Sequence, residues 1–198
     1  MHVELPSYPR APAEVTCKLR QPTQANRSEF TGLRRVTILA QAARWSFQVK
    51  YPPIIGESAF RPWRAALALL QGRAGTFQLP VTENYQTVAW GAGPPVVDGA
   101  NQIGSSVALR SLCRGSVVRR GWFITIGDAL HQVTREAIVG ADGRVSLDVM
   151  PIVAGYPDGA PVELGRPFAL VSMSDDEIGW TVGPGQRYDL SFNCEEAR

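Results

Sequence analysis

The twelve residues LLQGRAGTFQLP, numbers 69–80, decide the fold that this sequence predicts. Their first part completes an apolar helical pattern, Gly72-Arg-Ala-Gly75 interrupts it with a turn, and the rest forms a short strand that ends at Pro80. Glycine is common directly after a helix, and proline cannot keep donating to a β-ladder. The stretch therefore predicts a helix followed by a strand. It contains no nucleophile, metal-ligand pair or phosphate-binding loop.

A strand is predicted upstream of this stretch. From Arg44 to Tyr51 aromatic and aliphatic residues alternate with polar ones, which is the two-residue period of a half-buried strand. Pro52 and Pro53 follow it and end the ladder. One face of this strand is expected in the core and the other in water.

The helix between the two strands is expected over about residues 58–72. Ser58 is the candidate N-cap, Pro62 falls in or near the first turn, and Gly72 occupies the position of a C-terminal cap glycine. The apolar positions that recur at helical spacing are Phe60, Trp63, Leu67 and Leu70. Because the helix has a single apolar side, we expect it to lie on a sheet that contains both neighbouring strands.

The remaining sequence predicts short strands. Four prolines interrupt residues 1–32, so an extended arm or edge strand is expected there, and glycines and prolines in 91–99 indicate a linker. Further strands are expected at 102–112, 122–126, 130–135, 144–150, 168–173, 178–182 and 188–192. The turn Ala141-Asp-Gly143 is the strongest local hairpin signal. The fold class is therefore mainly β with one prominent helix.

The charge is unevenly distributed along the 198 residues, although the net charge is only +2. Residues 1–127 carry 15 Lys and Arg against six acids, a net +9, whereas residues 128–198 carry five against twelve, a net −7. The small net charge argues against a strongly basic nucleic-acid binder. The opposite charges of residues 1–127 and 128–198 are neutralised either within one folded subunit or between neighbouring copies.

The positions of the cysteines and the hydropathy of the sequence limit the cellular compartments in which the protein is expected. Cys17, Cys113 and Cys194 lie far apart, which argues against a zinc knuckle or a dense disulfide framework and fits a reducing cytoplasm. The first twelve residues lack the basic start and apolar core of a secretion signal, and no stretch approaches about 18 consecutive apolar residues. We therefore expect a soluble, unsecreted protein with no membrane partner.

No catalytic, cofactor-binding or metal-binding residue is predicted, so we expect neither an enzyme nor a cofactor. His131 could serve as a base, but it is interpreted as a hydrogen-bonded or exposed strand residue, and no G-x-S-x-G motif supports a triad. Asp175, Asp176 and Glu177 are consecutive carboxylates that point in different directions and lack the calcium-loop pattern. We interpret them as a solvated turn.

Two further groups of residues have both a functional and a structural interpretation. Residues 99–127 contain no acid and four arginines, Arg110, Arg114, Arg119 and Arg120. They either contact phosphate of a nearby nucleic acid, or form an exposed basic loop or a contact with an acidic neighbour. The five tryptophans, which could form a sugar platform but are expected mostly in the core, are Trp45, Trp63, Trp90, Trp122 and Trp180.

The order of these features resembles a known family. The segments are RWSFQVKYPP (44–53), LLQGRAGTFQLP (69–80), GWFITIGDALHQVTREAIVGADGRVSLDVMPIVAGYPDGAPV (121–162), PFALVSMSDDEIGW (167–180) and YDLSFNCEEA (188–197). Together they resemble a tail-tip component, of the distal-tail or minor-tail type, of long non-contractile-tailed bacteriophages and related prophages. The resemblance covers roughly residues 34–198, and its motifs are structural.

This resemblance implies a tail-tube-like β-sandwich with one flanking helix, formed by residues 1–95 and 166–198, and a small inserted β-barrel of residues 96–165. Proteins of this family form rings, usually hexameric, that join the tail tube to the baseplate hub around a DNA channel. It therefore implies a virion structural protein at the distal end of the tail, assembled in the host bacterial cytoplasm. The implied partners are further copies of the chain, tail-tube and hub proteins, and DNA in non-specific proximity.

Ring formation has a physical basis. An unpaired sheet edge is a template for another chain, and a closed ring pairs every such edge with the next copy. The alternative is a tail-tip module whose residues 96–165 bind a host-surface glycan. A wall-degrading hydrolase is a further alternative, but it needs an acid or nucleophile that this sequence does not single out.

Overall fold

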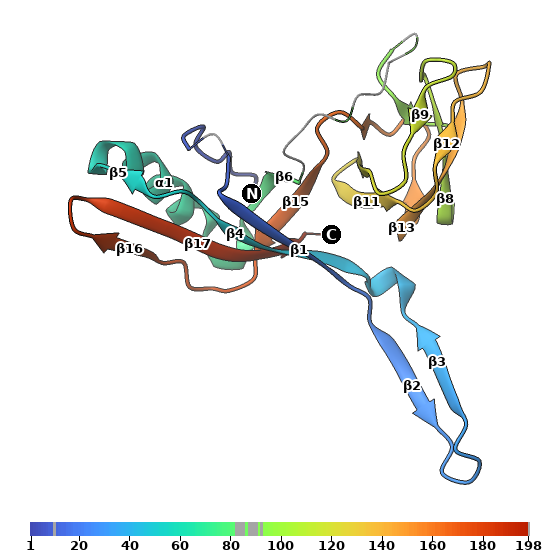
Figure 1. The fold of residues 1–198 in the computed structure, drawn as a ribbon, viewed down its shortest axis with the longest axis horizontal. Helices are drawn as coiled ribbons and strands as arrows, with labels where there is room; N and C mark the ends of the chain where they lie inside the picture. The colour runs from blue at the N-terminus through green and yellow to red at the C-terminus, as the bar shows by residue number, and fades with distance from the viewer. Residues whose placement is uncertain (10, 82–85, 87–90, 92, 198) are drawn as a thin grey trace. The chain divides into compact units, whose positions relative to one another are not determined.

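The computed structural model describes residues 1–9, 11–81, 86, 91 and 93–197 (Figure 1). They form two compact units: unit 1 contains residues 1–18, 45–81 and 168–198, and unit 2 contains residues 19–44 and 82–167. Residues 19–44 thus group with the later segment, whereas the resemblance had assigned them to the first domain. The mainly β fold with one α-helix is confirmed for the described residues.

Unit 1 is built on a seven-stranded sheet with the strand order β1-β4-β17-β15-β6, to which β5 and β16 are added by pairing with β17. Its strands are β1 (Glu14–Arg20), β4 (Arg44–Lys50), β5 (Ile54–Ile55), β6 (Thr76–Pro80), β15 (Phe168–Met173), β16 (Trp180–Gly183) and β17 (Arg187–Glu196). The long strand β17 pairs with four other strands, β16, β5, β4 and β15. Its first four residues pair with β16, and its later residues pair with β4 and β15.

The helix α1 (Glu57–Leu70) begins two residues earlier than an N-cap at Ser58 would allow, so the prediction of Ser58 as N-cap is wrong. The cap position belongs to Gly56, which has a φ of 90° and no capping side chain. A tertiary contact replaces the cap, because the Glu57 N–H donates to Gln186 Oε1 at 3.3 Å. Pro62 lies inside the helix, in its second turn.

The end of α1 confirms the interpretation of the stretch 69–80. Gln71 adopts the left-handed conformation, Gly72 follows with a φ of 65°, and a short 3₁₀ turn, η2 (Gly72–Ala74), leads to β6. Gly75 allows the chain to return closely to the helix, because its N–H donates to Leu70 O at 2.7 Å and a Cβ there would lie 2.7 Å from Leu70 Cα. The two glycines therefore join the helix to the strand.

The core of unit 1 lies between α1 and one face of the sheet. As expected, alternate residues of β4 are buried, and so are the apolar helix positions Phe60, Trp63, Leu67 and Leu70. Aromatic rings join the layers: Tyr51 and Trp63 have centroids 4.4 Å apart, and Phe60 stacks on Tyr188 at 4.4 Å. The indole N–H of Trp63 also donates to Tyr8 O at 2.6 Å, which ties the N-terminal segment to the helix.

Unit 2 contains a six-stranded sheet with the strand order β14-β10-β11-β13-β8-β7. It also contains two separate two-stranded sheets, β12-β9 and β2-β3. Its strands are β2 (Thr23–Arg27), β3 (Arg34–Ile38), β7 (Val96–Val97), β8 (Gln102–Arg110), β9 (Val117–Val118), β10 (Phe123–Ile126), β11 (Ala129–Val133), β12 (Ala137–Ile138), β13 (Val145–Tyr156) and β14 (Val162–Glu163). A short 3₁₀ turn, η1 (Ala40–Ala42), follows β3. The buried core of unit 2 consists mainly of valine, leucine and isoleucine side chains.

This sheet is nearly closed into a barrel. Its two outer strands approach each other, since Val96 forms an antiparallel bridge with Pro161 and the Val162 N–H donates to Pro95 O at 3.1 Å. The inserted barrel that the resemblance implied is thus confirmed as a barrel-like sheet.

The side chain of Gln86 completes this barrel at β10. Its Nε2 donates to Phe123 O at 2.6 Å and to Leu164 O at 2.7 Å, and its Oε1 accepts from the Phe123 N–H at 2.9 Å. A side-chain amide therefore pairs with backbone groups that a strand would otherwise satisfy.

The predicted hairpin around Ala141-Asp-Gly143 is wrong in its pairing. The turn itself forms, because the Gly140 N–H donates to Arg144 O at 2.9 Å. However, β12 on one side pairs with β9, and β13 on the other pairs with β8 and β11. The local sequence specified the turn, and packing in the barrel chose other partners for both strands.

Candidate interaction surfaces

A β-hairpin that no other described strand joins is the most conspicuous surface feature of the chain. It comprises residues 20–39, here called the arm, in which β2 and β3 run side by side as a separate two-stranded sheet (Figure 1). Its tip is closed by backbone hydrogen bonds from Ser28 N–H to Leu33 O and from Gly32 N–H to Ser28 O, each 2.9 Å. All ten residues of the two strands are exposed.

Large apolar side chains of the arm are exposed as well. Phe30 at the tip is 100% exposed, Ile38 is 68% exposed and Val36 is 47% exposed. A single two-stranded hairpin is marginally stable in water, and clustered exposed apolar residues commonly mark an interaction site. The arm is therefore the leading candidate for contact with another molecule.

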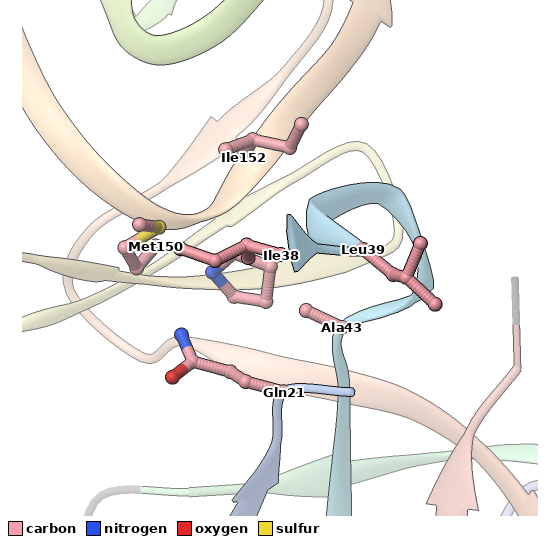
Figure 2. Close-up of a pocket in the computed structure, with 7 residues that line it drawn as sticks. Gln21, Ile38, Leu39, Ala43, Met150 and Ile152 are labelled. Carbon is pink, nitrogen blue, oxygen red and sulfur yellow. The ribbon is translucent and has the colours of Figure 1, made fainter. Parts of the chain in front are cut away.

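The base of the arm packs on β13 around a small apolar pocket (Figure 2). The pocket has a cavity volume of only about 20 Å³ and is lined by Gln21, Ile38, Leu39, Ala43, Met150, Pro151 and Ile152. Small-molecule sites usually have about 300–1,000 Å³ and several convergent polar groups. Gln21 supplies the single polar side chain of this lining, so we interpret the pocket as packing that anchors the arm.

The sheet of unit 1 has edges that differ in how they are covered. At β6 the chain's own N-terminus supplies the next partner, because Val3 N–H donates to Thr76 O at 2.7 Å and Thr76 N–H donates to Met1 O at 2.9 Å. Among the described strands, β1 pairs only with β4 and β16 pairs only with β17. These two strands present the unpaired backbone groups from which another chain could continue the sheet.

His131 is a hydrogen-bonded residue of strand β11, as interpreted from the sequence. Its side chain is fully buried, its Nδ1 lies 2.7 Å from Pro151 O, and its Nε2 lies 2.9 Å from Tyr156 Oη. Both ring nitrogens are thus engaged in the interior of unit 2. The arrangement joins β11 to two positions of β13 and does not present the imidazole to a substrate.

The acidic residues Asp175, Asp176 and Glu177 are exposed in a bend between β15 and β16, which fits the interpretation as a solvated turn. Asp176 Oδ1 lies 3.3 Å from Arg73 Nε, so one of the three carboxylates forms a surface ion pair. Within the described ranges, no group of three or more His, Cys, Asp or Glu side chains is arranged to hold a metal ion.

The four arginines of the acid-free segment do not act as one group. Arg110 is paired within unit 2, since its Nη1 lies 2.6 Å from Asp158 Oδ1 and 3.1 Å from Asp98 Oδ1. The Arg110 side chain, followed by the Gly99 N–H, holds the pKa of Asp158 below its ordinary value. The other three, Arg114, Arg119 and Arg120, are exposed. Arg110 therefore has a structural partner, and a phosphate contact is left to the exposed arginines.

The tryptophans lie mostly in the core. Trp45 and Trp63 are buried in unit 1, and Trp122 packs partly buried against the core of unit 2. Trp180 on β16 is 37% exposed and lies beside Phe60, with ring centroids 5.4 Å apart. Trp90 lies outside the described residues. No common platform for a sugar is formed by the tryptophans that are described.

The three cysteines are free. Burial raises the pKa of the Cys194 thiol to about 12, with a smaller contribution from Cys17, and burial also raises the pKa of Cys17. A thiol with a raised pKa is a poor nucleophile, because the thiolate is the reactive form.

Comparisons with known proteins add no assignment. No family model matches the sequence, and no curated protein matches it significantly. Among the helices of the described residues, none has the length and apolar character that crossing a membrane requires.

Sequence reasoning expected an extended arm or edge strand within residues 1–32, but it missed the hairpin of β2 and β3 and the role of Gln86. The arm did leave a signal, because Val36 and Ile38 alternate with the polar residues Arg35 and Thr37 in the period of a strand. Gln86 left none, since a single glutamine carries no information about distant backbone groups.

Proposed function

We propose that this chain is a structural subunit that assembles with further copies of itself into a closed ring. The observation that carries the proposal is the arm: ten exposed strand residues and a wholly exposed Phe30 form no core of their own. Burial of such a hairpin against another subunit would stabilise both. The mainly β fold and the open edges at β1 and β16 support assembly by strand contacts.

The position of this ring is proposed from the sequence resemblance. We infer a virion structural protein at the distal end of a phage tail, assembled in the host bacterial cytoplasm, where the ring joins the tail tube to the baseplate hub. DNA would pass through its centre. Exposed arginines such as Arg114, Arg119 and Arg120 can contact phosphate without reading sequence.

Two measurements test the proposal. Analytical ultracentrifugation over a wide concentration range should give a closed oligomer, and six copies of the 21.5 kDa chain would weigh about 129 kDa. Negative-stain images should show a ring with a central opening. Antibodies to the protein should label one end of the tail in particles whose genome encodes it.

A strict monomer that binds neither tail-tube nor hub proteins would overturn the proposal. If that monomer bound a host-surface saccharide on a glycan array, the alternative of a glycan-binding tail-tip module would replace it. Turnover of cell-wall polymer, abolished by one substitution, would favour a hydrolase.

A further inference from the structure

The arm has two chemically different faces. In the register of β2 and β3, Ala25 lies opposite Val36 and Arg27 lies opposite Arg34, and these pairs share a face with Ile38. The other face is polar and consists of Gln24, Asn26, Arg35 and Thr37. This first face thus combines apolar side chains with an arginine pair and, apart from the packing of Ile38 at the base of the arm, has no core behind it, so a partner could cover it.

The arginine pair makes the arm's need for a partner more specific. Arg27 and Arg34 are directly opposite, and like charges in that position destabilise a two-stranded ladder. Residues 20–39 contain four arginines and one acid, Glu29, and none of these arginines forms an ion pair among the described residues. A partner that offers carboxylates next to apolar side chains would remove this repulsion.

A complementary surface exists on unit 1 of the same polypeptide. Strand β16 carries Trp180, 37% exposed, and Val182, 55% exposed, which repeat two residues apart as Val36 and Ile38 do on the arm. Both lie opposite buried residues of β17, so they extend the apolar face of the sheet to its margin.

Carboxylates lie directly before this strand. Asp175 and Glu177 are exposed in the bend that precedes β16, and Asp176 between them is occupied by Arg73. We call Asp175, Glu177, Trp180 and Val182 the β16 surface. It combines acidic and apolar side chains as the arm combines basic and apolar ones.

We propose that the arm of one copy docks on the β16 surface of a second copy. Val36 and Ile38 cover Trp180 and Val182, and the arginine pair Arg27 and Arg34 faces Asp175 and Glu177. This inference rests on the proposed self-assembly and names the two surfaces that carry it. Because donor and acceptor are different patches of one chain, every copy gives one arm and receives one, which is a head-to-tail contact, and such a contact generates a ring when its rotation closes.

Charge reversal tests the proposal. The arm variant R27E/R34E and the acceptor variant D175R/E177R should each raise the dissociation constant of assembly at least about tenfold at 0.15 M salt, because like charges then meet across the contact. Both variants should keep the circular dichroism spectrum and melting temperature of the monomer, since all four side chains are exposed. The matched control R61E/R135E reverses two exposed arginines outside the arm, whose surface ion pairs contribute little to stability, and should assemble like the wild type.

Mixing the two reversed variants gives the decisive result. In an assembly in which the two variants alternate, the glutamates on the arm of R27E/R34E meet the arginines on the acceptor of D175R/E177R. At the next contact the unchanged arm of D175R/E177R meets the unchanged acceptor of R27E/R34E. An equimolar mixture should therefore regain assembly that neither variant shows alone, and so should the fourfold variant.

The possible failures are distinguishable. If the wild type assembles and neither reversal weakens it, the arm contact is wrong while the proposed function stands. If both reversals weaken assembly but the mixture stays monomeric, the contact between these two surfaces is also refuted. If the wild type is monomeric at every concentration, the proposed function fails, and this inference fails with it.

Discussion

Gly75 gives the sharpest test of how the stretch 69–80 builds the fold. Its backbone has a φ of −85° and a ψ of 149°, which alanine adopts without strain. However, a Cβ at this position would lie 2.7 Å from both Cα and O of Leu70, and these are backbone atoms that cannot rotate away. In the folded state the substitution Gly75→Ala therefore probes steric contact and not backbone strain.

The expected magnitude follows from two opposing effects. Forcing an extra methyl group into a packed site costs about 1–3 kcal/mol. Replacing glycine lowers the entropy of the unfolded chain and returns about 0.4–1 kcal/mol. We expect Gly75→Ala to lower the free energy of unfolding by about 1–2 kcal/mol, and the melting temperature falls by about 2–4 °C for each kcal/mol in a chain of this size.

Urea denaturation followed by tryptophan fluorescence measures this change, because Trp45 and Trp63 are buried in unit 1. The matched control is Gly179→Ala, where a Cβ would meet no atom within 4 Å and φ is not positive. The control should keep or slightly raise stability. A Gly75→Ala protein within about 0.3 kcal/mol of wild type would show that the helix and strand do not need this close approach.

Three other substitutions test the structure in different places. Gln86→Leu should lower the free energy of unfolding by about 2–4 kcal/mol in urea titrations, because three hydrogen bonds between the Gln86 side chain and the backbone of Phe123 and Leu164 are lost; an unchanged midpoint would contradict this. The pKa of Cys194 is raised from 9.0 to about 12 on folding, so its contribution to stability is full below pH 9 and is lost as the pH rises; between pH 8 and pH 10 Cys194→Ala should lose about 1.4 kcal/mol less stability than the wild type. The pKa of Asp158 is lowered from 3.8, so its contribution is lost as the pH falls, and the melting temperature of Asp158→Asn should change less than that of wild type between pH 5 and pH 3.

Local periodicity explains which parts of the fold could be predicted. The alternation in β4 and the helical spacing in α1 both report that one side of an element faces a core, and both elements were found with the expected buried sides. The turn at Gly72–Gly75 could also be predicted from the sequence. Gly72 adopts a positive φ, and Gly75 permits the close approach of the chain to the backbone of Leu70. Such features depend on residues that are neighbours in the sequence.

Features that depend on distant residues were not readable. The turn at Ala141-Asp-Gly143 forms, but the strands beside it pair with β9 and β8, a choice made by the closure of the barrel. The start of α1 is fixed by Gln186, which lies 129 residues from Glu57. In the arm, the alternation of Val36 and Ile38 indicates a buried face, yet that face is exposed in the single chain. The alternation of apolar residues predicts that one face is buried, but it does not indicate whether the surface that buries this face belongs to the same copy or to another one.

The charge asymmetry of the sequence is partly resolved inside each unit and partly left for a partner. Arg110 with Asp158 and Arg73 with Asp176 neutralise opposite charges within the folded chain. The arginines of the arm have no such partner among the described residues. Neutralisation within the subunit therefore accounts for part of the asymmetry, and the arginines that form no such ion pair lie where apolar side chains are also exposed.

The size of that exposed patch bears on how the proposed ring would form. Fully burying a large apolar side chain contributes about 1.5–3 kcal/mol, so Val36, Ile38 and Phe30 together supply at most about 9 kcal/mol. Association alone costs about 4–15 kcal/mol in lost freedom of motion. The favourable free energy of one arm contact is thus close to the cost of association, so two copies joined by a single contact bind each other weakly. Closing the ring adds one more contact without joining another copy, so the last contact is intramolecular and stabilises all the others. The proposed assembly should consequently populate monomers and closed rings, with few intermediates between them.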